Sequence, residues 1–415
     1  MTMLPMALIR RGLFGSDGRA DLPATPTLRP RYDVAIIGGG GHGLATAYFL
    51  ASRHRVGRIA VIERGYLGGG NTGRNTQVIR ANYITPEAIR FYARSLELYK
   101  GLSEELGFNV MFSGRGQLTL AQTDAAMRGF RLRAEANQHL GVHSEIIDRQ
   151  AIRELCPELN LMDETPQPVL GALWHPVGGM ARHDAVGWGF ARAAARLGVE
   201  IHQQTAVLGM DIEGGAVRRL RTTRGDIEVG AVVQAVAGAS SEVAAMAGLR
   251  LPIVTYPLQA LVTQPLKPFL NPLVSAPAYH CYVSQSSRGE AIIGGGSDPY
   301  PLYSTRVTLE MKEELLHAAL TMFPCLAGAK VLRQWAGMTD MTPDYSPVMG
   351  PTAVRGYYLD AGWGTWGFKA TPVRGETMAQ TVATGHAPQL IQSFGLDRFA
   401  DFVQINEMGA TAASH

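Results

Sequence analysis

A glycine-rich stretch early in the chain has the spacing of a phosphate-binding turn. The apolar segment Tyr32–Ile37 runs directly into Gly38, Gly40 and Gly43, and Glu63 follows twenty residues after the last of these glycines. In the dinucleotide fingerprint the first glycine permits a tight turn, and the second lets the backbone approach a pyrophosphate. The third glycine lets a helix pack closely on the strand, and the acid accepts the ribose hydroxyls. The pattern therefore predicts a bound dinucleotide.

The elements predicted around these residues are those that the fingerprint requires. The hydrophobic pattern predicts a strand over residues 32–37, a helix over 43–54 and a second strand over 58–63. The helix N-terminus would then face the phosphates and favour their negative charge. A glycine-rich turn that binds nothing is the alternative, and it does not account for this strand–helix–strand arrangement. The fingerprint leaves open which dinucleotide is bound.

Composition and charge exclude several classes of protein. The 415 residues suffice for two or three domains, and the net charge of +3 comes from 38 basic and 35 acidic residues without a long basic block. We therefore expect no nucleic-acid binding. No apolar run approaches the roughly 20 residues of a membrane span, so we expect no membrane partner.

The cysteines and the N-terminus indicate the compartment. Cys156, Cys281 and Cys325 are far apart and form no CxxC pair, so we expect neither a disulfide framework nor a metal site. This use of cysteine is typical of a protein in the reducing cytoplasm. In residues 1–30 the charged Arg10 and Arg11 follow the short apolar piece, which is the wrong order for a signal peptide. We expect an arm that docks on a partner.

Glycine-rich loops distributed along the chain favour FAD over a nicotinamide cofactor. Besides the fingerprint, glycines cluster at residues 68–70, 294–296 and 362–367. An extended FAD would have its adenosine on the first unit and its ring near residues hundreds of positions later. The segment 362–369, GWGTWGFK, precedes the last predicted helix, whose N-terminus would stabilise negative charge on a reduced flavin. By itself this segment is equally well explained as an ordinary strand-to-helix turn.

The order of strands and helices predicts an α/β chain, α+β overall, with two interleaved domains. One is a Rossmann-like FAD-binding domain, and the other is a substrate domain with a mixed sheet. Helices are expected over residues 86–106, 125–140, 184–197, 308–323 and 373–384. We assign residues 1–30 to an N-terminal arm, 31–110, 170–245 and 340–390 to the FAD-binding domain, 111–169 and 246–339 to the substrate domain, and 391–415 to a C-terminal tail.

Five segments resemble the beta subunits of heterotetrameric sarcosine oxidases, within the wider glycine/D-amino-acid oxidase group of flavoproteins. They are YDVAIIGGGGHGLATAY, GGNTGRNT, GGMARHD, YPLQALV and GWGTWGFK, and the likeness extends over nearly the whole chain beyond the arm. The resemblance implies oxidative demethylation of N-methylglycine, with hydride transfer to noncovalent FAD and electrons passing to covalent FMN and then to oxygen. The products would be glycine, hydrogen peroxide and formaldehyde, or methylene-tetrahydrofolate made on the alpha subunit. It also implies alpha, gamma and delta partner subunits.

The same resemblance implies a substrate site made of two cations. Arg80 would hold the substrate carboxylate, for which a guanidinium fork suits both oxygens, and Lys369 would bind it from the other side. Together they would orient the N-methyl carbon toward the flavin, so that much of the catalysis is positioning. Without the resemblance, Arg80 would be read as part of a surface salt bridge and Lys369 as a solvated residue of a helix's first turn.

The resemblance also supplies the expected cofactor contacts. For FAD the residues are Gly38, Gly40, Gly41, His42, Gly43, Glu63, Asn71, Thr76, Val78, Val207, Gly364, Gly367 and Lys369. His183 matches the position at which the family's histidine is tethered to FMN, and Arg182, His280 and Arg288 are weaker candidates for its phosphate. From the pattern alone His183 would be exposed beside Asp184, which would act as the N-cap of the following helix.

Two departures from the family pattern leave alternatives open. Single-chain relatives attach FAD to a cysteine near the position of Gly337, where this chain has none, so FAD should be noncovalent. Those relatives also have an oxygen-activating lysine where this chain reads Ala291–Gly294. A dehydrogenase for another N-methyl amino acid, such as N-methylglutamate, therefore remains an alternative. A non-catalytic flavin-binding scaffold subunit and an NAD-dependent dehydrogenase are further ones.

Overall fold

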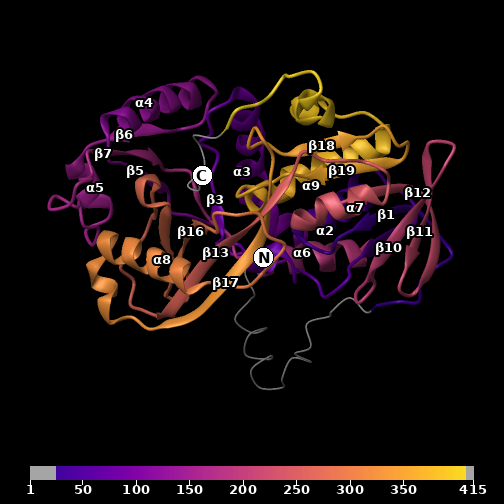
Figure 1. The fold of residues 1–415 in the computed structure, drawn as a ribbon, viewed down its shortest axis with the longest axis horizontal. Coiled ribbons are helices and arrows are strands. Elements are labelled where there is room, and N and C mark those ends of the chain that lie inside the picture. Colours follow the sequence, from indigo (N-terminus) through magenta and orange to yellow (C-terminus); the bar gives the residue numbers. More distant parts are fainter. Residues whose placement is uncertain (1–24, 408–415) are drawn as a thin grey trace.

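Two eight-stranded sheets, each covered by helices, organise the chain in the computed structural model, which describes residues 25–407 (Figure 1). A small three-stranded sheet joins them. The predicted α/β class is thereby confirmed. Residues 1–24 of the predicted arm and 408–415 of the predicted tail lie outside the described residues. None of the helices within the described range is long and apolar enough to cross a membrane.

The first sheet has a parallel core in the order β9-β2-β1-β12-β19. Its strands are short apolar runs such as IAVI because both faces of the sheet are covered. Antiparallel strands β10, β11 and β18 extend it at its edges. The strands are β1 (Arg31–Ile37), β2 (Ile59–Ile62), β9 (Glu200–His202), β10 (Val207–Glu213), β11 (Ala216–Thr222), β12 (Gly225–Gln234), β18 (Val348–Pro351) and β19 (Tyr357–Ala361).

Four helices form one apolar core with a face of this sheet, and the short α7 (Ser240–Ala245) packs on the other face. The four are α2 (Gly41–Arg53), α3 (Pro86–Leu106), α6 (His183–Arg196) and α9 (Gly367–Thr384). Helices α2 and α9 lie in close contact, because a Cβ on Gly375 would be only 2.5 Å from the Cβ of Ala45. The first turns of these two helices, more than 300 residues apart in the sequence, also meet, since Nε2 of His42 lies 2.7 Å from the carbonyl oxygen of Gly367.

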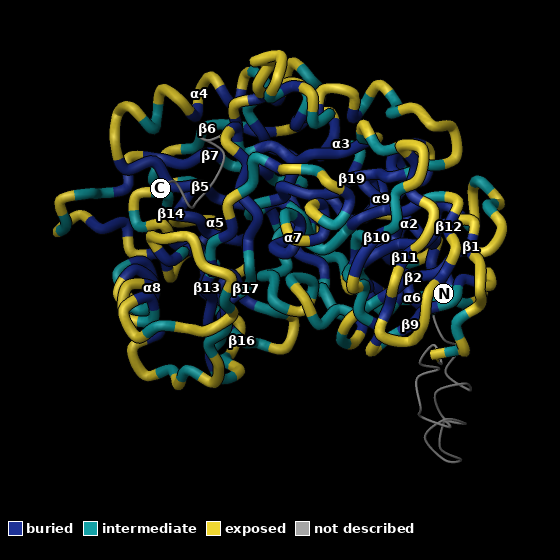
Figure 2. Tube along the Cα trace, turned by 45° about the vertical axis from the view of Figure 1, so that its right-hand side comes forward, coloured by how far each residue is buried: buried dark blue, intermediate teal, exposed yellow. Residues whose placement is uncertain are grey.

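The second sheet has the strand order β17-β13-β16-β15-β14-β5-β7-β6 and forms its own core with α8 (Leu309–Met322). Helices α4 (Asp124–His139) and α5 (Arg149–Leu155) lie at its other end. The exposed residues gather in outer helices and turns, whereas the strands are mostly buried (Figure 2). The strands are β5 (Gln117–Ala121), β6 (Glu145–Ile147), β7 (Gly171–His175), β13 (Val254–Pro265), β14 (Leu273–Ala276), β15 (Cys281–Gln285), β16 (Glu290–Ser297) and β17 (Val331–Met341).

The third sheet pairs β3 (Val78–Ile79), β8 (Gly179–Met180) and β4 (Ser113–Gly114). It continues the polar loop after β2, which contains the short 3-10 turn η1 (Asn71–Arg74). The residues that follow β3 lead into α3, and Ala81 and Tyr83 pack in the core that covers the first sheet. Arg80 lies directly after β3, between that strand and these core residues.

Some predicted boundaries differ from the structure. Strand β7 pairs with β5 and β6 in the second sheet, although its residues fall in the segment 170–245 assigned to the FAD-binding domain. The C-terminal segment is packed rather than separate, since Ile391, Phe394 and Ile405 belong to the core around α2 and α9. The domain boundaries themselves stay a prediction.

The last helix begins at Gly367, six residues before its predicted start at residue 373. Pro372 lies inside it and cannot donate to the carbonyl of Phe368. That carbonyl instead accepts from the hydroxyls of Thr371, at 2.8 Å, and Tyr99, at 2.7 Å. These substitute donors let the helix pass through the proline, and one of them comes from a distant helix that the local pattern does not reveal.

Candidate functional site

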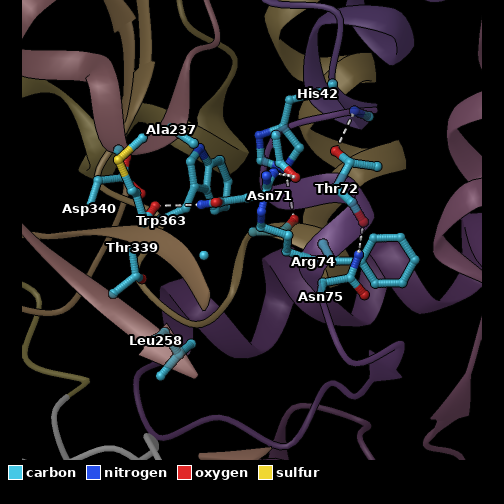
Figure 3. Close-up of a pocket in the computed structure, with 18 of the residues that line it drawn as sticks. His42, Asn71, Thr72, Arg74, Asn75, Ala237, Leu258, Thr339, Asp340 and Trp363 are labelled. Carbon is cyan, nitrogen blue, oxygen red and sulfur yellow. Dashed lines mark hydrogen bonds between the residues drawn. The ribbon is translucent and has the colours of Figure 1, made fainter. Parts of the chain in front are cut away.

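A cavity of about 670 Å³ lies between the two large sheets, within the size range of about 300–1,000 Å³ that is usual for cofactor sites (Figure 3). Its lining comes from segments far apart in the sequence. The fingerprint, the loop after β2 and the loop before α9 form one side, and strands β5, β13 and β14 of the second sheet form another. The cavity is therefore assembled from both predicted domains.

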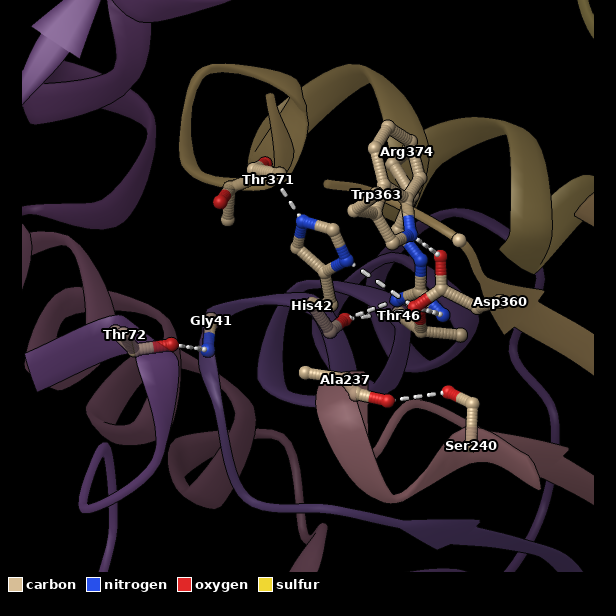
Figure 4. Close-up of polar contacts among 12 residues, drawn as sticks. Gly41, His42, Thr46, Thr72, Ala237, Ser240, Asp360, Trp363, Thr371 and Arg374 are labelled. Atoms are coloured by element: carbon tan, nitrogen blue, oxygen red, sulfur yellow. Dashed lines mark hydrogen bonds and ion pairs between the residues drawn. The ribbon is translucent and has the colours of Figure 1, made fainter. Parts of the chain in front are cut away.

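The fingerprint glycines have a geometry that no side chain could share. Gly38 has φ +111°, and a Cβ on it would lie 2.1 Å from the carbonyl oxygen of Ala235. A Cβ on Gly43 would lie 2.0 Å from the carbonyl oxygen of Gly38. The first turn of α2 consequently sits directly on the end of β1. At that turn the N–H of Gly41 donates to Oγ1 of Thr72 at 2.9 Å (Figure 4).

The carboxylate of Glu63 is held at the carboxyl end of β2. Its two oxygens accept from the N–H groups of Gly39 and Gly65, both at 2.7 Å. An ionised carboxylate can accept about four hydrogen bonds, so Glu63 can accept further hydrogen bonds from a ligand in the cavity that it lines. That placement suits an acceptor for ribose hydroxyls.

The loop before α9 is fixed from the end of β17. The N–H of Gly362 donates to the carboxylate of Asp340 at 2.7 Å, and the N–H of Gly364 donates to the backbone carbonyl of Asp340 at 2.9 Å. Burial raises the pKa of Asp340 to about 7. The loop thus presents Gly364 and Gly367 at the cavity wall, beside the N-terminus of α9.

The polar loop after β2 is tied to the second sheet. Nδ2 of Asn71 donates to the carbonyl of Met338, and the hydroxyls of Thr76 and Tyr282 lie 2.8 Å apart. Asn71, Thr76 and Val78 all line the cavity, and Val207 reaches it from the start of β10. These contacts hold the loop between the two halves of the site.

Arg80 and Lys369 meet at the same cavity, and each is only 7 % exposed. Nη1 of Arg80 donates to the carbonyl and side-chain oxygens of Asn82 at 3.0 and 3.1 Å, and its guanidinium lies over the ring of Tyr83. Nζ of Lys369 donates to the carbonyl of Thr365 at 3.1 Å. Burial, and then the charge of Arg80, lowers the pKa of Lys369 well below its usual value. A bound anion would relieve this repulsion.

Three further polar residues at this end of the cavity were not predicted from the sequence. Arg133 of α4 donates through Nε to the carbonyl of Asn82 at 2.8 Å, and burial, with the charge of Arg80, lowers its pKa to about 9. Oε1 of Gln117 and Oγ1 of Thr119 are buried without a hydrogen-bond partner among the described residues. The alternation in QLTLA, with Gln117 and Thr119 on one face of β5, was the available signal.

His183 lies outside this cavity, at the first residue of α6. Its Nδ1 is buried and has no hydrogen-bond partner in the part of the chain that is described. Burial lowers the pKa of His183, so the ring is neutral near pH 7. The helix N-cap is Arg182 rather than Asp184, because the helix already begins at His183. The Asp184 carboxylate pairs with the Arg182 guanidinium at 2.7 and 2.9 Å.

Of the residues suggested for the FMN phosphate, the structure brings two close together, Arg182 and Arg288, which both lie near Glu290. Arg288 forms an ion pair with Glu290 at 2.7 Å, and Glu290 also acts on Arg182, whose pKa is raised mainly by its hydrogen bond to Asp184. His280 precedes β15 and Arg288 follows it, so they lie at opposite ends of a five-residue strand, roughly 17 Å at about 3.3 Å per residue. Arg182 and Arg288 are therefore the two that the structure places near each other, and the roles of all three residues stay predictions.

Every residue predicted to bind FAD lines the cavity except Gly43, which packs α2 on β1. Their individual roles stay predictions. Cys156, Cys281 and Cys325 form no disulfide, and none of them lines the cavity. Within residues 25–407 no group of three or more metal-ligating side chains comes together.

Comparison with known proteins agrees with this geometry. Residues 33–381 match the DAO family, FAD dependent oxidoreductase. Sarcosine oxidase subunit beta of Rhodobacter capsulatus is 45 % identical over 409 residues, which cover 99 % of this chain and 98 % of that protein. The subunit of the same name from an Arthrobacter species is 44 % identical, covering 94 % and 97 %. L-proline dehydrogenase from P. horikoshii superposes with a TM-score of 0.84 at 32 % identity, covering 90 % of this chain and 99 % of that one. The chain therefore belongs to the DAO family of FAD-dependent oxidoreductases, and it is similar over nearly its whole length to sarcosine oxidase beta subunits.

Proposed function

We propose that this chain is the catalytic beta subunit of a heterotetrameric sarcosine oxidase, which demethylates N-methylglycine oxidatively. The observation that carries the proposal is the meeting of Arg80 and Lys369 in the cavity that the fingerprint and the loop before α9 also line. The full-length likeness to relatives named as sarcosine oxidase beta subunits supports it. The coarser conclusion, an FAD-dependent amine oxidoreductase, does not depend on the identity of the substrate.

The residues present fit noncovalent FAD. The approach at Gly38 and Gly43 leaves no room for a Cβ, so the first turn of α2 lies directly on the end of β1. The positive end of this helix would then favour the phosphates of a bound FAD. Glu63 would accept the ribose hydroxyls, and Gly364 and Gly367 would contact the ring through their backbone. When bound, FAD supplies the acceptor for a hydride from the substrate.

Arg80 and Lys369 would bind the substrate carboxylate from two sides and so orient its N-methyl carbon. Loss of a hydride from that carbon leaves an iminium, which water converts to formaldehyde and glycine unless the methylene group passes to tetrahydrofolate on the alpha subunit. The two electrons finally reduce oxygen to hydrogen peroxide. The burial of both cations supports a site from which bulk water is excluded.

Covalent FMN at His183 belongs to the same proposal. Nδ1 of His183 has no hydrogen-bond partner among the described residues, and burial favours the neutral ring. In the tautomer with the proton on Nε2, Nδ1 would be the unprotonated nitrogen that an attachment to FMN requires. Arg182 and Arg288 would contribute to the phosphate site, although each already pairs with a carboxylate. The FMN would lie where the alpha subunit meets this chain, and gamma and delta subunits would complete a cytoplasmic enzyme.

A dehydrogenase for an N-methyl dicarboxylic acid such as N-methylglutamate is the second candidate. The observation that favours it is Arg133, a third buried cation near Arg80. A second substrate carboxylate would find there both a positive charge and a donor, the hydroxyl of Thr119. N-methylglycine has no group that would use them.

Two measurements test the function. Stopped-flow absorbance compares the rates at which N-methylglycine and N-methylglutamate reduce the flavin of the purified complex, with and without oxygen. We expect faster reduction by N-methylglycine and turnover with oxygen. Turnover only with an artificial acceptor, or a preference for N-methylglutamate, would favour the dehydrogenase.

Mass spectrometry of the denatured protein tests the flavin attachment. We expect FMN mass on the peptide that contains His183 and release of FAD into solution. The variant His183→Asn should lose the covalent mass, whereas the matched variant of exposed His386, His386→Asn, should keep it. Release of all flavin from the wild-type chain would refute the attachment.

A further inference from the structure

His42 occupies a position at which the fingerprint requires no particular residue. It follows Gly41 in the first turn of α2, between the second and third fingerprint glycines. Its side chain points toward α9, and the residue lines the cavity (Figure 4). The fingerprint therefore leaves its presence unexplained.

Both ring nitrogens of His42 lie against oxygen acceptors. Nδ1 is 3.1 Å from Oδ2 of Asp360, and Nε2 is 2.7 Å from the backbone carbonyl oxygen of Gly367. A carbonyl oxygen cannot donate, and an ionised carboxylate cannot either. A neutral imidazole, with only one N–H, would leave a lone pair facing one of these oxygens. Both contacts become hydrogen bonds only if the ring carries two protons.

The surroundings of Asp360 support its ionised form. Oδ1 accepts from Nε1 of Trp363 at 2.6 Å, and Nη2 of Arg374 lies 2.7 Å from Oδ2. Burial would raise the pKa of Asp360, but the charges of Arg374 and His42 hold it below its usual value. A proton on Oδ2 would have to displace the guanidinium, so the carboxyl is an acceptor for His42 and not a donor.

The network joins two segments of the flavin site. Arg374 of α9 also donates to the carbonyl of His42 and to the hydroxyl of Thr46, both in α2. Of the two cations, only His42 lines the cavity, and Arg374 is fully buried behind it. Within this network His42 is therefore the cation at the cavity wall, beside the Asp360 carboxylate, which also lines the cavity, and next to the positive ends of two helix dipoles.

We propose that Asp360 is a positioning residue that keeps His42 as a fixed imidazolium in the cavity wall, and that this cation favours the reduced, anionic form of the bound flavin. Negative charge developing on the ring is stabilised by a preorganised positive group in a poorly hydrated site. The inference rests on FAD binding, and it does not depend on which amine is the substrate.

The midpoint potential of the noncovalently bound flavin in the purified holoenzyme is the test. His42→Gln removes the cation, so we expect the equilibrium between oxidised and reduced flavin to shift at least tenfold toward the oxidised form, a decrease of about 30 mV for a two-electron couple. His386→Gln, which changes an exposed histidine in the loop after α9, should leave the potential unchanged. An unchanged potential in His42→Gln would overturn the proposal.

Asp360→Asn gives the sharper result, because two mechanisms predict opposite signs. If Asp360 acted only as a negative charge, its removal would make the cavity more positive and raise the potential. If it acts through His42, the new amide donates to Nδ1, the ring becomes neutral, and the potential falls. A rise would refute the proposal.

A spectroscopic measurement keeps the proposal testable if Asp360→Asn fails to bind flavin. In ¹⁵N-histidine-labelled wild-type protein, the His42 signals are identified by their absence from His42→Gln. We expect both nitrogens to have the chemical shifts of protonated imidazolium at pH 7. One protonated and one unprotonated nitrogen would overturn the proposal.

Discussion

Replacing Gly43 with alanine tests whether close packing at the fingerprint holds α2 in its binding position. The new Cβ would lie 2.0 Å from the carbonyl oxygen of Gly38 and 3.2 Å from Cγ2 of Ile36. Ordinary contact begins near 3.4 Å, so the helix start has to move by roughly 1 Å or more away from β1. Overpacking of this kind costs about 1–3 kcal/mol.

The displacement acts on the N–H groups that face the phosphates, so FAD affinity should suffer more than the fold does. A loss of about 2.7 kcal/mol corresponds to a Kd roughly 100-fold higher. The assay is fluorescence titration of the apoprotein with FAD, accompanied by urea unfolding. Gly101→Ala in α3 is the control, because its Cβ would have nothing within 4 Å. Wild-type FAD affinity in Gly43→Ala would refute the packing argument.

Three further predictions concern charges in and near the cavity. Arg80→Lys keeps the charge but loses the guanidinium fork. Because a charged hydrogen bond contributes about 1.5–3 kcal/mol, KM for N-methylglycine should rise about tenfold or more. Steady-state kinetics measures KM, and an unchanged value would contradict carboxylate binding by Arg80. Burial raises the pKa of Asp340 from 3.8 to about 7, so the folded chain binds this proton more tightly than the unfolded chain and loses stability as pH rises from 4 to 7. Asp340→Asn should remove about 2.6 kcal/mol of that loss between denaturation at pH 5 and at pH 8, and an unaltered pH dependence would count against it. Glu407 accepts from the N–H groups of Ile84 and Thr85 at the start of α3 and faces Arg133. Glu407→Ala should therefore lower the free energy of unfolding by about 3 kcal/mol. A change below about 1 kcal/mol would show that the C-terminal segment is not anchored there.

Much of the first sheet could be predicted because its signals are local. The strand, glycine turn and helix from Tyr32 onward follow from a short apolar run and glycine spacing, and α3 has its predicted bounds, Pro86–Leu106. In α3 the hydroxyl of Thr85 caps the first turn, and Gly107 in the left-handed conformation ends the helix. Such features depend on neighbours within a few residues.

Long-range contacts limited the prediction elsewhere. Helix α9 passes through Pro372 because Tyr99 and Thr371 supply the donors that the proline removes. Arg133 was missed because its place beside Arg80 depends on how α4 packs across the second sheet. His280 and Arg288 are eight residues apart, yet a strand between them places them at opposite ends of a hairpin.

By itself the sequence predicted the arrangement of the nucleotide end: short spacing places Gly38 and Gly43 where β1 meets α2, and Glu63 at the end of β2. The tertiary structure alone decided the electrostatics of the other end. Whether Lys369 is repelled by Arg80, and whether His42 keeps two protons between Asp360 and Gly367, depends on distances between segments hundreds of residues apart. Charge interactions follow separation and burial, and neither can be read from the order of the residues.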